Sequence, residues 1–343
     1  MKIGLVGYQG SGKTTLFEWL TGVAADLASA HSGQSAMAAV PEPRVQSLCE
    51  IYHPKKVTLA SLELVDTPGL SRTHEGNAAR LGLIREAGCL VLVVAAFGGR
   101  DPLTDLASFR EDLLLADMEI VSGRVGRLRD SVKKPRPNRD QELAELAALE
   151  RVLAALEAGT PLTAEQMSEE DLRATRSFRL MWEKPMLVLV NVADDEADAD
   201  RFDRPAAGAE PRMMAARIGL ERELERMEAD DRAEFERELG LSGSRRDEVL
   251  RAILDASGQM LYFTAGEKEV RTWMLRQGGT ALEAADNIHS DLARGFIRAE
   301  TMQVEDLVRL GSEREVKAAH LVRQEPKDYV VRDGDILNIK FSV

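Results

Sequence analysis

A glycine-rich stretch near the start of the chain constrains its fold more than any other feature. An apolar run, Lys2–Val6, enters residues 7–15, which read GYQGSGKTT, and an amphipathic stretch follows from Leu16. The stretch fits the pattern G-x-x-x-x-G-K-[ST], in which a strand, a phosphate-binding loop and a helix follow one another. It therefore predicts an α/β domain, a P-loop NTPase fold with a mostly parallel sheet flanked by helices.

The residue types in this loop are those that binding of a nucleoside triphosphate requires. Glycines let successive backbone N–H groups turn toward one set of phosphate oxygens, and the helix that follows adds the positive end of its dipole. Lys13 supplies a cation for the β- and γ-phosphates, and the Thr14 hydroxyl is a natural ligand for Mg²⁺. We expect nucleotide contacts from Gly7, Tyr8, Gln9, Gly10, Ser11, Gly12, Lys13, Thr14 and Thr15.

A second motif of nucleotide-dependent switch proteins ends the next apolar run. Residues 59–65 lead into DTPG at 66–69, which is the D-x-x-G pattern. At the carboxyl end of a strand, Asp66 can hold a water bound to Mg²⁺, and the Gly69 amide can donate to the γ-phosphate. The expected catalytic residues are Lys13 and Gly69, and the expected metal-binding residues are Thr14 and Asp66.

The residue after Gly69 departs from many switch GTPases, in which a Gln orients the attacking water. Here that residue is Leu70, and an aliphatic side chain cannot position water. Hydrolysis would then need another group, a bound ion or a partner. A side chain from the polar residues 71–75 can reach in, although a solvated loop is the simpler interpretation.

The stretch between the two motifs is rich in Ala, Ser and Gly over residues 24–40, and it predicts a mobile loop. In nucleotide switches a segment ordered by the γ-phosphate lies here, and a Thr usually makes the contact. No Thr occurs in this stretch, and the sequence does not choose among Ser29, Ser32 and Ser35 as substitutes. His31 fits a loop residue better than a ligand.

Two further Val/Leu runs, 89–96 and 186–190, predict parallel strands buried on both faces. The second run ends in NVAD at 191–194, where guanine-binding P-loop proteins have N-K-x-D. In that motif the Asn fixes the loop, the Lys stem lies along the purine, and the Asp accepts hydrogens from guanine N1 and N2. Val replaces the Lys here, so GTP and ATP both stay open. The expected base contacts are Asn191, Val192 and Asp194.

Helical periodicity over 103–121 and 141–182 predicts a helical hairpin inserted in the nucleotide domain at about 103–183. A solvated charge run and a contact with RNA or a ribosome explain the basic residues between these stretches equally well. These residues are Arg124, Arg127, Arg129, Lys133, Lys134, Arg136 and Arg139.

The chain changes character near Gly258. Strand-like stretches and one helical stretch, 280–289, follow, with strands expected at 261–264, 270–274, 329–331 and 336–341. This pattern predicts a compact α+β module. We therefore expect a nucleotide domain over 1–257, with the hairpin inside it, and a second domain over 258–343.

Composition limits the partners. A net charge of -13 argues against a dominant electrostatic attraction to nucleic acid but leaves room for a local basic patch, and no sequence-specific DNA partner is expected. No apolar run reaches the ~18 residues that a bilayer span needs, so no membrane partner is expected, and the first strand leaves no room for a signal peptide. Cys49 and Cys89 lie in apolar surroundings without motif spacing, as reduced thiols of a cytoplasmic protein do.

Taken together, these motifs resemble the YchF subfamily of Obg-related P-loop GTPases, in the TRAFAC class. The resemblance extends over nearly the whole chain and is closest in the last module, which is similar to that family's TGS domain. It rests on the phosphate loop, VPEPR at 40–44, PKKV at 54–57, the inserted hairpin, FTAGEKEVRTW at 263–273, IHSD at 288–291, GFIRAE at 295–300, and KDY and DGD at 327–329 and 333–335.

The resemblance implies a cytoplasmic nucleotide hydrolase that associates with ribosomes, with Leu70 as the family's hydrophobic replacement of the Gln. The family prefers ATP, a trait tied to an N-x-x-E segment whose last position is Asp194 here. The family's Thr-Ile-Glu-Pro-Asn is absent from residues 24–40. Gly10 stands where the family has an Asn that in relatives can hold a monovalent cation, and Ala215 where a Ser is expected. These departures indicate a divergent branch.

The interpretation that accounts for most of these features is a Mg²⁺-dependent switch protein that binds and slowly hydrolyses GTP or ATP. Its expected partner is the ribosome, with rRNA of the large subunit, in translation or a stress response. A nucleotide-sensing protein with little or no hydrolysis is the alternative, which Leu70 and the missing Thr support. A P-loop kinase is disfavoured, because the motifs at 66–69 and 191–194 follow the order found in GTPases.

Overall fold

The computed structural model describes residues 1–342 except 27, 29–31, 160–166, 197, 209 and 239–242. The chain forms two compact units, the first from residues 1–36 and 63–246 and the second from 37–62 and 247–343. The expected division at residue 257 therefore differs from the observed units. The difference arises because residues 37–62 and most of helix α9 (Arg246–Ala256) pack with the C-terminal module.

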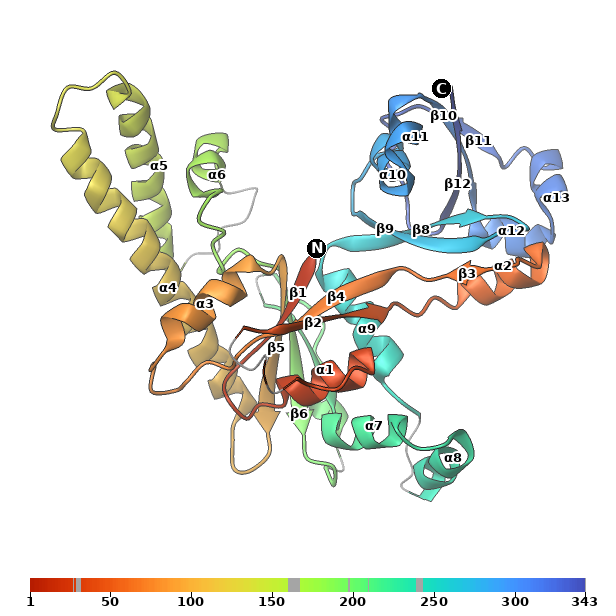
Figure 1. The fold of residues 1–343 in the computed structure, drawn as a ribbon, viewed down its shortest axis with the longest axis horizontal. Coiled ribbons are helices and arrows are strands. Elements are labelled where there is room, and N and C mark those ends of the chain that lie inside the picture. Colours follow the sequence, from red (N-terminus) through yellow and green to blue (C-terminus); the bar gives the residue numbers. More distant parts are fainter. Residues whose placement is uncertain are drawn as a thin grey trace. The chain divides into compact units, whose positions relative to one another are not determined.

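The sheet of the first unit has six strands in the order β2-β4-β1-β5-β6-β7 (Figure 1). Strand β1 is paired in parallel with β4 on one side and β5 on the other, and β5, β6 and β7 continue in parallel. The strand order therefore reverses at β1, with β4 on one side and β5 on the other. In open α/β folds, ligands bind at the carboxyl ends of the strands next to such a reversal. The strands are β1 (Lys2–Val6), β2 (Gln34–Ala39), β4 (Ser61–Asp66), β5 (Cys89–Ala96), β6 (Met186–Val192) and β7 (Arg212–Ala216).

Helices cover this sheet and extend from it. Ile84, Phe109 and Leu113 pack on apolar side chains of β1, β5, β6 and β7, so α3 and α4 cover one face. Helices α1 and α7 pack against each other. The expected P-loop fold is therefore confirmed. The helices are α1 (Lys13–Thr21), α3 (Asn77–Glu86), α4 (Pro102–Ser131), α5 (Arg139–Glu157), α6 (Glu169–Thr175), the 3-10 helix η2 (Ala199–Phe202), α7 (Ile218–Glu225) and α8 (Ala229–Glu238).

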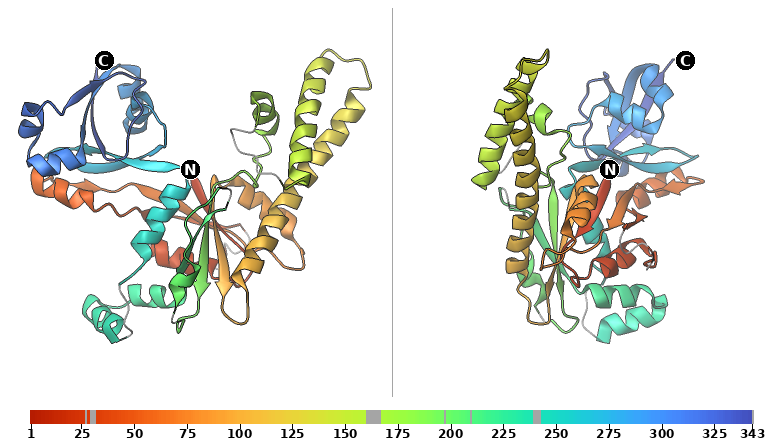
Figure 2. Two further views of the ribbon diagram at one scale, coloured as in Figure 1. Left: turned by 180° about the vertical axis from the view of Figure 1, so that it is seen from behind. Right: turned by 60° about the vertical axis from the view of Figure 1, so that its left-hand side comes forward.

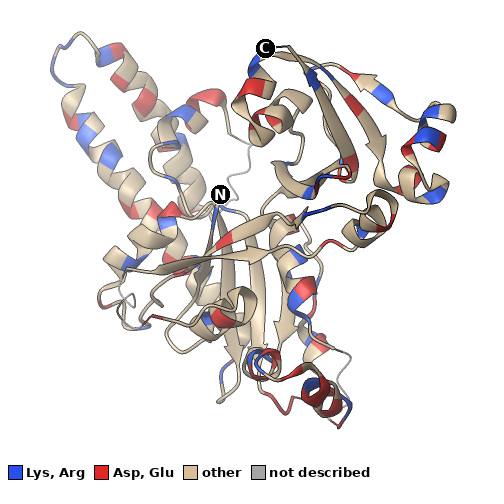
Figure 3. Cartoon of the chain, turned by 45° about the vertical axis from the view of Figure 1, so that its right-hand side comes forward, with Lys and Arg blue, Asp and Glu red and all other residues tan. Residues whose placement is uncertain are grey.

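Helices α4 and α5 lie side by side as the expected hairpin (Figures 1 and 2). Helix α4 continues to Ser131, so Arg124, Arg127 and Arg129 lie within it and not in the connection where the sequence analysis placed them. Arg124 pairs with Glu145 at 2.8 Å and Arg129 with Glu150 at 2.7 Å, and both glutamates lie on α5. These ion pairs and an apolar seam between the helices extend α4, and charges of both signs lie along the hairpin (Figure 3).

Other elements also differ from the sequence expectations. The stretch expected to be a mobile loop contains β2, because pairing with β4 orders residues of low strand propensity. Ser29 and His31 lie outside the described residues. The heavily charged residues between 218 and 238 form two helices, α7 and α8. The strand expected at 329–331 is only an isolated bridge from Val330 to Thr280.

The second unit is an α+β module around a sheet of order β11-β10-β12-β8-β9-β3. Side chains from α2, α12 and α13 form one core cluster with the sheet, and α10 contributes to the other. The strands are β3 (Val57–Thr58), β8 (Gln259–Ala265), β9 (Val270–Arg276), β10 (Phe296–Gln303), β11 (Arg323–Glu325) and β12 (Asp335–Phe341). The remaining helices are α2 (Arg44–Tyr52), α10 (Ala281–Ile288), α11 (Ser290–Arg294), α12 (Val304–Leu310) and α13 (Glu313–Ala318).

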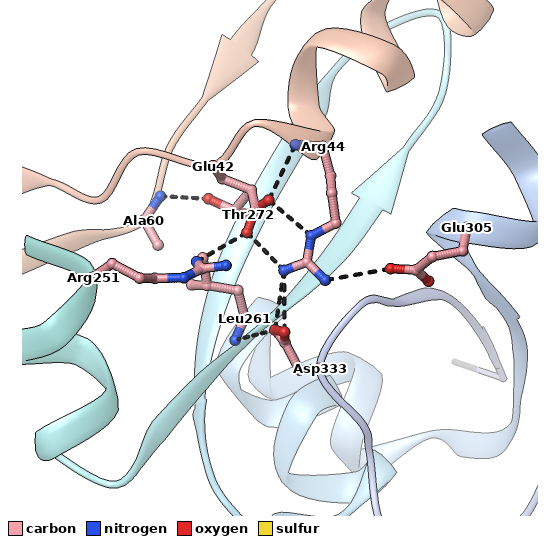
Figure 4. Close-up of polar contacts among 8 residues, drawn as sticks. All are labelled: Glu42, Arg44, Ala60, Arg251, Leu261, Thr272, Glu305 and Asp333. Atoms are coloured by element: carbon pink, nitrogen blue, oxygen red, sulfur yellow. Dashed lines mark hydrogen bonds and ion pairs between the residues drawn. The ribbon is translucent and has the colours of Figure 1, made fainter. Parts of the chain in front are cut away.

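An ionic cluster around Arg44 holds residues 37–62 in the second unit (Figure 4). The Arg44 guanidinium donates to Glu42 through Nε and Nη2, each at 2.7 Å, and Nη2 also reaches Asp333 at 3.1 Å. Arg251 donates to Glu42 at 3.0 Å, and the Glu42 side chain is only 1% exposed. The two-residue strand β3, which pairs with β9, adds a second attachment.

No helix in the described part of the chain has both the length and the apolar character needed to cross a membrane.

Candidate active site

The phosphate loop turns sharply between β1 and α1, and two of its glycines have no room for a side chain. A Cβ on Gly7 would lie 2.4 Å from the Val93 carbonyl oxygen, and one on Gly12 would lie 2.2 Å from Asn191 Nδ2. Both glycines also have positive φ angles, 141° and 103°, which favour glycine. The loop therefore approaches neighbouring backbone and side chains as closely as a phosphate cradle requires.

Lys13 places a buried cation in this cradle. Lys13 is only 6% exposed, and its Nζ donates to the Tyr8 carbonyl oxygen at 2.9 Å. Burial lowers the pKa of Lys13 to about 8, although the nearby Asp66 carboxylate acts in the opposite direction. A desolvated ammonium with a neutral carbonyl as its hydrogen-bond partner favours an anionic ligand.

Thr14 and Asp66 meet beside Lys13, although 52 positions separate them in the sequence. Because β1 and β4 are adjacent and parallel, both motifs reach the same edge of the sheet. The Thr14 hydroxyl donates to Asp66 Oδ2 at 2.7 Å, and Asp66 Oδ1 is buried without a hydrogen-bond partner among the described residues. Burial raises the pKa of Asp66, and the hydrogen bond from Thr14 opposes this rise.

These two residues fit a Mg²⁺ site. Where Mg²⁺ is bound together with phosphates, proteins usually provide one or two oxygen ligands. The unpartnered Asp66 Oδ1 and the Thr14 hydroxyl are oxygen atoms of this kind. The described residues contain no cluster of three or more His, Cys, Asp or Glu side chains that could hold a metal ion. The nucleotide and water would therefore have to supply the remaining ligands.

The segment after Asp66 is docked on the phosphate loop. Leu70 N donates to Gly7 O at 3.1 Å, and Gln9 N donates to Leu70 O at 3.0 Å. A Cβ on Gly69 would lie 2.7 Å from Lys13 Nζ, so glycine at this position brings the backbone up to the cation. The Leu70 side chain is 0% exposed and belongs to the apolar core of the unit. It therefore does not take part in positioning water.

Arg72, in the polar stretch after Leu70, is engaged elsewhere. Arg72 Nη2 pairs with Asp105 Oδ2 on α4 at 2.7 Å, and its guanidinium lies 4.4 Å from the centre of the Tyr8 ring. The Tyr8 hydroxyl donates to Asp112 at 2.8 Å. The side chain of Tyr8, one of the expected nucleotide contacts, thus points into the unit and joins the loop to α4.

The base end of the site follows β6. Asn191 Nδ2 donates to the Ser11 carbonyl oxygen at 3.0 Å, so this side chain holds the phosphate loop. Asp194 Oδ1 accepts the N–H of Leu220 near the start of α7 at 3.1 Å. The Val192 side chain is buried, and Ser11 Oγ is buried without a hydrogen-bond partner among the described residues.

A cavity of about 580 Å³ connects the phosphate and base ends, a size typical of small-molecule sites. Six of the expected site residues are not among those that line it: Gly7, Tyr8, Gln9, Ser11, Asp66 and Gly69. Phe97 and Gly219 line it although the sequence gave no motif for them. Their position after β5 and β7, at the carboxyl ends of parallel strands, is the signal that could have found them. The lining residues are Gly10, Gly12, Lys13, Thr14, Thr15, Phe97, Asn191, Val192, Ala193, Asp194 and Gly219.

Comparison with known proteins agrees with this geometry. A family model described as a 50S ribosome-binding GTPase matches residues 2–121, and the model of the YchF GTPase C-terminal region matches 260–342. The "Ribosome-binding ATPase YchF" of Bacillus subtilis (strain 168) is 33% identical over 365 residues, covering 99% of each chain. The chain belongs to the YchF family.

Two further relatives show how far the YchF likeness extends. The "Obg-like ATPase 1" of Oryza sativa subsp. japonica is 33% identical over 372 residues, covering all of this chain and 92% of the relative. The solved structure of the Schizosaccharomyces pombe YchF GTPase has a TM-score of 0.83 at 27% identity, over 99% of this chain and 97% of the other. The expected family and its two-part architecture are thus confirmed.

Proposed function

We propose that this YchF-family chain is a cytoplasmic switch protein that binds a Mg²⁺-purine nucleoside triphosphate and hydrolyses its terminal phosphate. One observation carries the proposal. A buried lysine, a Thr–Asp pair with an unpartnered carboxylate oxygen, and a glycine backbone held against that lysine meet at one end of a cavity that fits a nucleotide.

Each group has a role in this reaction. Lys13 binds the β- and γ-phosphates, Thr14 and Asp66 hold Mg²⁺, and the Gly69 backbone follows the γ-phosphate. The metal held by Thr14 and Asp66 would offset the negative charge that develops on the phosphate oxygens. Because Leu70, the residue after Gly69, is joined to the loop by two backbone hydrogen bonds, loss of the γ-phosphate changes the surroundings of the segment that these bonds hold.

The base site accepts either purine by its chemistry. The Asp194 carboxylate can accept N–H groups from guanine N1 and N2 or from the adenine amino group. Val192 stands where the guanine-binding motif has a Lys, and its side chain is buried, so this position offers no lysine stem to a base. Competition between labelled GTP and unlabelled ATP for the purified chain decides the substrate in one measurement.

The ribosome is the proposed partner. This assignment rests on two descriptions that name the ribosome. One is that of the family model that matches the nucleotide domain, and the other is that of the bacterial relatives. The connection of the hairpin adds exposed cations: among ion pairs of the described residues, none involves Lys134 or Arg136. An rRNA backbone of the large subunit would meet such charges favourably.

Phosphate release under multiple turnover, with and without ribosomes, tests hydrolysis. Lys13→Ala should abolish nucleotide binding, since losing one charge-assisted contact costs about 1.5–3 kcal/mol and burial adds to it. Lys268→Ala, which removes an exposed lysine of the second unit, is the matched control and should bind as the wild type does. Unchanged affinity in Lys13→Ala would reject the site. Tight binding without phosphate release, even with ribosomes, would leave a nucleotide sensor in place of a hydrolase.

A further inference from the structure

The guanidinium of Arg100 lies against the phosphate loop. Arg100 belongs to the connection between β5 and α4, and its Nη1 donates to the Gly10 carbonyl oxygen at 3.0 Å. A Cβ built on Gly10 would lie 3.4 Å from Arg100 Nη2 and 3.6 Å from Nη1. A longer side chain at position 10 would therefore compete with this guanidinium for the same space. Glycine at position 10 leaves that space to a cation from another part of the chain.

The charge of Arg100 has no carboxylate partner among the described ion pairs. Arg72, in the segment after Leu70, pairs with Asp105 at 2.7 Å. Arg80, which lies close enough to Lys13 to act on its pKa, donates to Asn77 Oδ1 at 3.3 Å and to the Glu75 carbonyl oxygen at 3.4 Å. A guanidinium has five N–H donors in a planar fork that matches phosphate oxygens. Because one loop carbonyl takes only one of these donors, Arg100 keeps donors and a full charge for an anionic ligand beside the loop.

The surrounding backbone holds Arg100 at the edge of the nucleotide cavity. On one side of it, Phe97 lines the cavity and accepts the Arg100 N–H at 3.3 Å. On the other side, Asp101 caps α4 by accepting the N–H groups of Leu103 and Thr104. The base of the side chain is thus fixed between a residue of the cavity wall and a capped helix.

Terminal-phosphate hydrolysis needs positive charge where the transition state develops negative charge on phosphate oxygens. Leu70 is buried in the core, so the position that carries a Gln in many switch GTPases contributes nothing to the reacting atoms. Lys13 is one cation at the loop, and Arg100 is another that donates to a loop carbonyl oxygen. We propose that Arg100 is a catalytic arginine supplied by the chain itself, whose guanidinium contacts the γ-phosphate during hydrolysis. This inference rests on the proposed hydrolase function.

The step balances without any change in Arg100. A water oxygen forms a bond to the γ-phosphorus, and the bond from that phosphorus to the β–γ bridging oxygen breaks. The electron pair leaves with the diphosphate nucleotide, and the proton of the water goes to inorganic phosphate. Arg100 stays protonated throughout and donates hydrogen bonds to oxygens that become more negative.

Arg100→Ala should therefore lower the single-turnover rate at least about 100-fold, since catalytic arginines of this kind contribute 10³–10⁵ in kcat. Affinity for the diphosphate nucleotide should change less than about threefold, because the contact is made to the γ-phosphate. Arg100→Lys should retain part of the rate, since it keeps the charge and loses the fork. Arg173→Ala, an exposed arginine of α6 that lines no part of the cavity, is the control and should keep the full rate.

A second measurement separates catalysis from a structural role. Aluminium fluoride with Mg²⁺ and the diphosphate nucleotide mimics the transferring phosphoryl group. Calorimetry should show that the wild type and Arg173→Ala bind this mixture more tightly than the diphosphate alone, whereas Arg100→Ala loses the gain. Millimolar guanidinium chloride should restore part of the rate of Arg100→Ala and leave the control unchanged.

The outcomes distinguish this inference from the proposed function. A wild type that hydrolyses nucleotide at the same rate as Arg100→Ala overturns the role of Arg100 alone. An equal loss of diphosphate and triphosphate affinity in Arg100→Ala means that Arg100 only supports the loop, which also overturns it. A wild type that binds but never hydrolyses nucleotide refutes the hydrolase. The aluminium fluoride measurement then still decides whether Arg100 recognises a phosphoryl group, and an equal response in wild type and variant rejects it.

Discussion

Replacing Arg44 by alanine should destabilise the second unit by about 3–5 kcal/mol, the cost of removing one partner from a buried ion pair. The Glu42 carboxylate, whose side chain is 1% exposed, would lose two hydrogen bonds of 2.7 Å and keep that from Arg251 at 3.0 Å. The contact of Arg44 with the Phe263 ring, 5.1 Å from its centre, contributes about 0.5–1 kcal/mol more. The half-exposed Asp333 adds at most about 1 kcal/mol.

The assay is urea unfolding followed by tryptophan fluorescence. Trp273 lies in the second unit and the other two tryptophans, Trp19 and Trp182, lie in the first. A background with phenylalanine at these two positions makes the signal specific to the second unit. Arg314→Ala is the control, because this arginine side chain is 90% exposed and, among the described residues, forms an ion pair only with the adjacent Glu315. It should cost less than about 1 kcal/mol.

Arg44→Lys should fall between the two variants, since an ammonium keeps the charge and cannot donate through a planar fork. A loss below about 1 kcal/mol in Arg44→Ala, equal to the control, would show that Arg251 alone satisfies Glu42. The cluster in Figure 4 would then not anchor residues 37–62.

Three further predictions concern charge. Burial would raise the pKa of Glu42, but hydrogen bonds from Arg44 hold it below its ordinary value; its contribution is therefore complete above about pH 4.3 and is lost as the pH falls through the lower folded pKa. The difference in unfolding free energy between wild type and Arg44→Ala should shrink between pH 5 and pH 3, and a constant difference would contradict this. If Asp194 reads guanine, Asp194→Asn should weaken GTP binding and favour xanthosine triphosphate, whose base has an acceptor where guanine has a donor; unchanged selectivity in competition binding would place base recognition elsewhere. If about three hairpin cations touch rRNA phosphates, the log–log salt slope of ribosome binding should be near -2, at about -0.7 per contact; charge reversal at Lys133, Lys134 and Arg136 should flatten it in co-sedimentation, and equal binding at every salt concentration would refute the contact.

The parts of the fold that the sequence predicts well are local and strongly patterned. Strand β5 occupies residues 89–96 as expected, because an unbroken Val/Leu run can only be buried on both faces. The meeting of Thr14 with Asp66 follows from two motifs placed at the carboxyl ends of strands. Such motifs encode their own surroundings, so pattern and position suffice.

The parts that escape the sequence depend on partners distant in the chain. Strand β3 has two residues and exists because β9, more than two hundred positions later, pairs with it. From the sequence, Arg124 and Arg129 are expected in the connection between the helices. Their glutamate partners lie on the opposite helix, so the local sequence does not show that these arginines are paired within the hairpin. The contact of Arg100 with Gly10 joins an unremarkable arginine to a loop ninety positions earlier. The periodicity of neighbouring residues carries no information about pairings between residues so far apart in the chain.

The second unit is assembled from two stretches of sequence, so three peptide bonds, those after residues 36, 62 and 246, join it to the first. It cannot be removed by shortening the chain at one end. A chain that stops before residue 247 would keep α2 and leave Val45 and Leu48 without the apolar side chains that bury them. The isolated C-terminal fragment would lack the same helix. A chimaera that exchanges this unit between relatives must therefore carry both stretches together. The effects of a simple deletion will come first from exposed core residues and only then from the loss of any binding surface.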